Sequence, residues 1–105
     1  MWNELTEKQR TALVYLNYFL GRIGSANDAE DHGYHDDARR MQEESCDNIG
    51  RLLRDAPFIA DLFPQLESQI KDQSLFVVGW ALIQREIDAL LALPAAEKVR
   101  DGNAK

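Results

Sequence analysis

Two histidines three residues apart, His32 and His35, are the residues in this sequence whose types and spacing are best suited to chemistry. They lie within the acidic segment DAEDHGYHDD, residues 28–37. Imidazole nitrogens and carboxylate oxygens are ligands that zinc, iron and nickel accept. However, Gly33 places both histidines in a loop or at a helix start, and no second ligand cluster completes a site. We therefore expect a solvated acidic loop whose carboxylates favour the protonated imidazoles, with no bound metal or cofactor. Metal binding through His32 and His35 is the less favoured alternative.

The one cysteine, Cys46, is the other candidate for nucleophilic chemistry. Its neighbours Glu43, Glu44 and Asp47 would raise the pKa of its thiol, which makes it a poor nucleophile. The sequence also lacks a phosphate-binding loop, a dinucleotide fingerprint and a Ser-His-Asp order. Together these features predict a protein that is not an enzyme. A single cysteine excludes an intrachain disulfide, and we expect a cytoplasmic location.

The net charge of −6 can be assigned to one segment, residues 26–48. Eight carboxylates in this segment face only Arg39 and Arg40, whereas the charges in the rest of the chain cancel. A concentrated field of one sign steers charged partners toward a surface. We expect the anionic contact to consist of Asp28, Glu30, Asp31, Asp36, Asp37, Glu43, Glu44 and Asp47, with Tyr34 as an aromatic anchor. The alternative, that these charges serve only solubility and helix capping, stays open.

The partner that this charge predicts is another protein with a basic groove, including a groove that normally holds nucleic acid. Carboxylates spaced along a helix can stand in for phosphates there. Small acidic helical inhibitors of bacteria and phages, such as anti-CRISPR and toxin-immunity proteins, are similar in type, although no motif is shared. We therefore expect an inhibitor or regulator. A pI near 4.8 argues against direct binding of nucleic acid. The longest apolar run, residues 75–83, is too short for the about 20 residues of a membrane span.

Helical spacing of apolar residues dominates the chain, which predicts an all-α fold. We expect one bundle domain over residues 1–94, with three long helices and one short helix, and a flexible polar tail over residues 95–105. The first helix begins after Thr6 with a capping box to Gln9, and ends either near Gly24 or at Asp31.

The other helices follow from breakers and caps. The second helix is expected from His35 to Asp55, after a break at Gly33. Pro57 starts a short apolar turn, and Pro64 either kinks the chain or restarts a helix. Ser74 is the expected cap of the last long helix, residues 75–93.

Surplus apolar side chains on the first and last helices support a second function class. The favoured interpretation is a first helix buried on most sides, and the alternative gives Tyr15 and Tyr18 to a partner surface. The surplus consists of Val14, Tyr18, Val77, Trp80 and Leu91. If exposed, it would suit a homo-oligomeric structural or adaptor module, such as a symmetric dimer. This is the runner-up to the anionic inhibitor.

Overall fold

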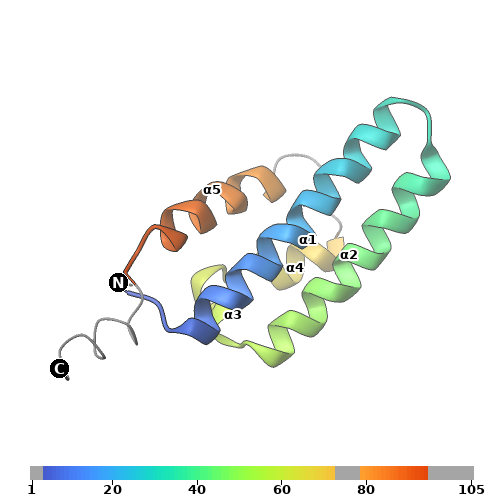
Figure 1. The fold of residues 1–105 in the computed structure, drawn as a ribbon. Helices are drawn as coiled ribbons and strands as arrows, with labels where there is room; N and C mark the ends of the chain where they lie inside the picture. Colours follow the sequence, from blue (N-terminus) through green and yellow to red (C-terminus); the bar gives the residue numbers. More distant parts are fainter. Residues whose placement is uncertain (1–3, 73–78, 95–105) are drawn as a thin grey trace, which may run out of the picture.

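The computed structural model describes residues 4–72 and 79–94, and these residues form helices and no strand (Figure 1). The all-α prediction is therefore confirmed for the part of the chain that is described. The helices are α1 (Glu7–Asp31), α2 (His35–Asp55), α3 (Phe58–Leu62), α4 (Leu66–Asp72) and α5 (Gly79–Leu91). The expected Ser74 cap, the start of the last helix and the polar tail over residues 95–105 lie outside the described residues.

Helices α1 and α2 form a long antiparallel hairpin that organises the molecule (Figure 1). The capping box is confirmed: the Gln9 amide donates to Thr6 Oγ1 at 3.1 Å, and the Thr6 amide donates to Gln9 Oε1 at 2.9 Å. Of the two ends considered for α1, the structure has the longer one, at Asp31. The chain then reverses at Gly33, whose φ of +88° suits glycine, and α2 has the predicted bounds.

The core lies where α1 meets α2 on one side and α5 on the other, with α3 and α4 packed against α2. Fully buried leucines and isoleucines from every described helix and from the N-terminal segment fill it, namely Leu5, Leu13, Leu16, Leu20, Ile23, Ile49, Ile59, Leu66 and Ile87. On α2 the buried residues are Ala38, Ser45 and Ile49, whereas Met41 and Leu52 are partly buried.

The C-terminal end of α5 is tied to the start of α1 by hydrogen bonds between residues far apart in sequence. The Arg10 guanidinium donates to the Leu91 carbonyl at 2.7 Å and to the Leu93 carbonyl at 2.6 Å. The Leu5 amide donates to the Pro94 carbonyl at 3.0 Å. Arg10 thereby satisfies two carbonyl groups at a helix end that would otherwise lack partners.

One sequence-based expectation about the first helix is corrected. The favoured burial of the first helix on most sides is wrong, because Tyr15 and Tyr18 are 55% and 62% exposed. These two side chains thus lie largely outside the contacts that α1 makes with α2 and α5. Gly21 and Gly24 both lie inside α1, so neither of them ends the helix. Pro64 restarts the helix as α4, so the segment after Pro57 contains two short helices.

Candidate functional site

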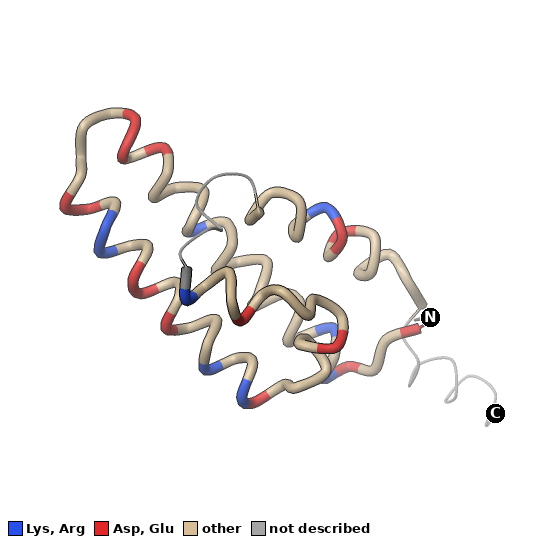
Figure 2. The backbone as a smooth tube through the Cα atoms, turned by 180° about the vertical axis from the view of Figure 1, so that it is seen from behind, with Lys and Arg blue, Asp and Glu red and all other residues tan. Residues whose placement is uncertain are grey.

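The carboxylates nearest the turn between α1 and α2 form an acidic tip, which we define as Asp28, Glu30, Asp31, Asp36 and Asp37, together with Tyr34. Figure 2 shows acidic residues gathered around this turn, at one end of the hairpin. All six side chains are exposed, and Tyr34 is 63% exposed. The hairpin turn also projects beyond α5 and α4 (Figure 1). A partner could therefore approach the acidic tip from several sides.

His32 and His35, on either side of Gly33 at the turn, each face an acidic residue of α1. The Nδ1 atom of His35 lies 2.8 Å from Glu30 Oε1, which links the start of α2 to the end of α1. The Nδ1 atom of His32 lies 2.8 Å from the Asp28 carbonyl oxygen and 3.9 Å from Asp28 Oδ1. The hydrogen bond to this carbonyl, followed by the Asp28 charge, raises the pKa of His32 above its ordinary value.

The geometry gives no support to the metal alternative. Within residues 4–72 and 79–94, no three His, Cys, Asp or Glu side chains converge on a point that could hold a metal ion. His32 and His35 instead pair with separate acidic residues on α1.

The helix dipole accounts for the acids on one side of the turn and not for those on the other. Asp36 and Asp37 lie in the first turn of α2, where the helix dipole favours negative charge. Asp28, Glu30 and Asp31 lie in the last turn of α1, where the dipole favours cations, and that turn contains no basic residue. The acids of α1 thus occupy positions that weaken the helix.

The predicted acids further along α2 are separated from the tip. Arg39 and Arg40 intervene, and Arg40 Nη2 lies 2.7 Å from Asp37 Oδ1. Glu43 and Asp47 are exposed on the outer side of α2, whereas Glu44 turns toward α1 and lies 4.0 Å from Arg22 Nη2. The structure therefore brings six of the nine predicted contact residues together and leaves Glu43, Glu44 and Asp47 along the hairpin.

A second surface, which sequence reasoning treated only as an alternative, lies on the side of α1 that no other described helix covers. We call it the open face; on α1 it consists of Thr11, Val14, Tyr15, Tyr18, Arg22 and Ser25. Tyr18 packs edge-on against half-buried Phe19, with ring centroids 5.7 Å apart, and Tyr15 stacks on the same ring at 6.5 Å. Both tyrosine rings thus pack on Phe19 and remain exposed.

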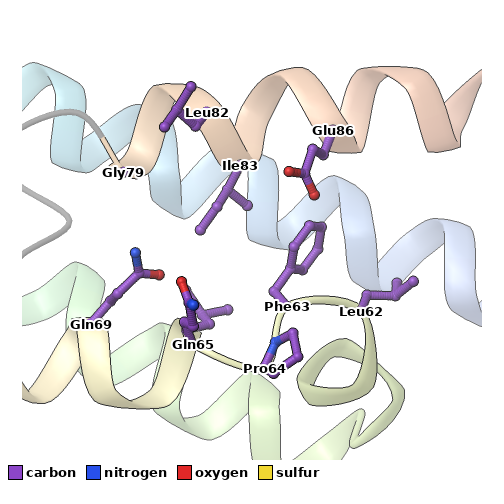
Figure 3. Close-up of a pocket in the computed structure, with 10 residues that line it drawn as sticks. Leu62, Phe63, Pro64, Gln65, Gln69, Gly79, Leu82, Ile83 and Glu86 are labelled. Atoms are coloured by element: carbon purple, nitrogen blue, oxygen red, sulfur yellow. The ribbon is translucent and has the colours of Figure 1, made fainter.

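The described surface also contains hollows, two of which lie beside α3. A pocket of about 270 Å³ lies between α5 and the turn joining α3 to α4, with Phe63, Gln65, Gln69, Ile83 and Glu86 in its wall (Figure 3). Glu86 is the one titratable group among its described lining residues, so the wall offers no acid–base pair. A larger groove of about 530 Å³, mostly apolar, runs from Tyr15 toward α3 and adjoins the open face.

Cys46 is half-buried on α2. Its burial, followed by the charge of Asp47, raises the pKa of the thiol. A thiol in this environment stays protonated at neutral pH and reacts slowly.

Comparison of the chain with protein-family models, with curated proteins and with solved structures finds no match. Within the described residues, no helix is both long and apolar enough to cross a membrane.

Proposed function

We propose that this protein binds a basic surface of another protein through its acidic tip and thereby inhibits or regulates that partner. The observation that carries the proposal is the position of Asp28, Glu30 and Asp31 in the last turn of α1. Carboxylates there oppose the helix dipole, so the dipole does not account for them; Asp28 and Glu30 each pair with a histidine, whereas no ion pair within the described residues involves Asp31. Solubility would be served equally by carboxylates at many exposed positions. Residues that weaken the fold locally are typical of functional sites.

The shape of the hairpin supports the same function. In this proposal, α1, α2 and the last helix act as the three long helices of one bundle, with the α3–α4 segment as a short connection. The bundle holds the tip away from its body, and the tip presents carboxylates from two antiparallel helices (Figures 1 and 2). Such a projecting group can enter a groove whose lysines and arginines normally face phosphates. Tyr34 at the turn adds an aromatic contact.

The test compares two variants with the same net charge. The tip variant carries Asp28→Asn, Asp31→Asn and Asp36→Asn, which remove charge and keep the side-chain shape. Like the control variant described next, it changes no core residue, so it should keep the helical circular dichroism of the parent.

The control variant carries Asp55→Asn, Asp61→Asn and Asp88→Asn, at exposed positions outside the acidic tip. The parent and the two variants are each used as bait in extract of the native host. A host protein that the parent and the control retain but the tip variant does not retain is then purified. Its affinity is then measured directly. A purified partner that binds the tip variant as tightly as the parent would overturn the proposal.

A further inference from the structure

We infer that the open face is the interface of a symmetric dimer, in which a second copy of the chain packs antiparallel across α1 and α2. This inference concerns a different surface from the acidic tip and does not depend on the function proposed for it. The open face has an apolar centre, since Val14, Tyr15 and Tyr18 are 51%, 55% and 62% exposed. Exposed tyrosines held in place by packing suit an interface, because little conformational entropy is lost when they are covered.

The register of the hairpin follows from the pair formed by Arg22 and Glu44. Because the helices are antiparallel, Tyr18, four residues before Arg22, lies level with Asn48, four residues after Glu44. Tyr18 also lies near the middle of α1 (Glu7–Asp31). A two-fold axis that lies in the plane of the interface, perpendicular to the helices and level with Tyr18, would place one hairpin over the other along nearly their whole length.

Charges along the edge of this face complement one another under that axis. Glu44 and Arg51 lie seven residues apart on one side of α2, about one turn on either side of Asn48. The two-fold rotation places Glu44 opposite Arg51 of the second copy, twice per dimer. Arg51 is exposed, and no hydrogen bond or ion pair within the described residues fixes its guanidinium. On α1 the same rotation places Arg22 over Tyr15 of the second copy, where a cation–π contact can form.

The acidic tips select the antiparallel arrangement over the parallel one. A two-fold axis along the helices would place both tips side by side, where their carboxylates repel one another. The antiparallel axis places them at opposite ends of the dimer. Each tip then remains free for a partner.

The available area is close to what a stable interface needs. Helix α1 has 25 residues and is about 37 Å long at 1.5 Å per residue, and two packed helices are about 20 Å across. The face therefore offers about 700 Å², close to the roughly 800 Å² that each partner buries in a standard interface.

Sedimentation of the full chain tests this inference with matched tyrosine variants. At roughly 100 µM, well above the dissociation constant of a micromolar complex, we expect the parent to be a dimer. The variant Tyr15→Glu/Tyr18→Glu should raise the dimer dissociation constant at least about tenfold, because it places charge at the centre of the interface. The control Tyr34→Glu changes an equally exposed tyrosine outside the open face and should leave the dimer intact. A parent that is monomeric at this concentration, or an unchanged dimer in the double variant, would overturn the inference.

A charge swap and a cross-link test the symmetry itself. Glu44→Arg should weaken the dimer by opposing two arginines, and adding Arg51→Glu should restore it.

In a Cys46→Ser background, a short bismaleimide should join Asn48→Cys to its copy and leave Asp36→Cys at the tip unjoined. Cross-linking at the tip and not at position 48 would show a different arrangement and contradict the proposed axis.

Discussion

The indole ring of Trp80 on α5 lies directly against Gly24 on α1: a Cβ atom at position 24 would be 2.8 Å from Cζ3 of that ring. Carbon atoms do not approach so closely, so any larger residue at position 24 would require the Trp80 ring to move. A Cβ atom at position 21, one turn earlier, would have Gln84 Nε2 as its nearest neighbour, at 3.6 Å. That distance leaves room for a methyl group. Two glycines in one helix thus have different structural roles.

We predict opposite effects on stability for the two glycine-to-alanine substitutions. Gly24→Ala should destabilise the fold by about 1–3 kcal/mol, because the Trp80 ring must move. Gly21→Ala should stabilise it by about 0.5–1 kcal/mol through helix propensity. Urea unfolding followed by circular dichroism measures both. Equal stabilisation by the two substitutions would show that the contact with Trp80 carries no constraint.

The sequence predicted the helix boundaries better than the packing of the helices. Thr6, Gln9, Gly33 and Pro57 act through their own backbone geometry, which local sequence determines, and they are found where they were expected. The role of Gly24 depends on a ring 56 residues further along the chain, and no local pattern contains that information.

The same distinction applies to the candidate surfaces. The acidic tip was predictable because its residues are neighbours in sequence on either side of one turn. The exposure of Tyr15 and Tyr18 was not, because it depends on which sides of α1 the other helices cover. An apolar run such as residues 12–20 is compatible with burial on two sides or on three.

Arg10 provides a second stability prediction. Replacing it with Met keeps the aliphatic length but leaves the Leu91 and Leu93 carbonyls without their donor, at a cost of about 1.5–3 kcal/mol. Hydrogen exchange at the Leu5 amide, which donates to Pro94, should become faster. The control Lys8→Met lies on the exposed surface and should change stability by less than about 0.5 kcal/mol. Unchanged exchange at Leu5 in the Arg10 variant would contradict this role.

His32 makes the stability of the tip depend on pH. Its pKa in the folded protein is raised by the Asp28 carbonyl and then by the Asp28 carboxylate. A raised folded pKa means that the contribution is fully present below the ordinary value of about 6.5 and is lost as the pH rises through the folded pKa. The parent should therefore be more stable than His32→Gln at about pH 5.5 and equally stable at about pH 8.5. An NMR titration that finds the His32 pKa at or below its ordinary value would refute the assignment.

Acids on the two sides of the turn should differ in their effect on stability. Asp31→Asn removes a carboxylate from the end of α1 and should stabilise the fold by about 0.3–1 kcal/mol. Asp36→Asn removes one from the start of α2 and should destabilise it by a similar amount. Thermal unfolding at low salt measures both changes. Destabilisation by Asp31→Asn would mean that Asp31 serves the fold, and the main support for a binding role would be lost.

The most direct test of the central claim is the salt dependence of binding between the protein and the purified partner isolated with it. Between about 0.1 M and 1 M salt the Debye length falls from about 10 Å to about 3 Å, which screens exposed charges. If the acidic tip makes the contact, the affinity of the parent should fall at least about tenfold over this range. The tip variant (Asp28→Asn, Asp31→Asn, Asp36→Asn) should bind weakly at both salt concentrations. Equal affinity of the parent and the tip variant at 0.1 M salt would contradict the account.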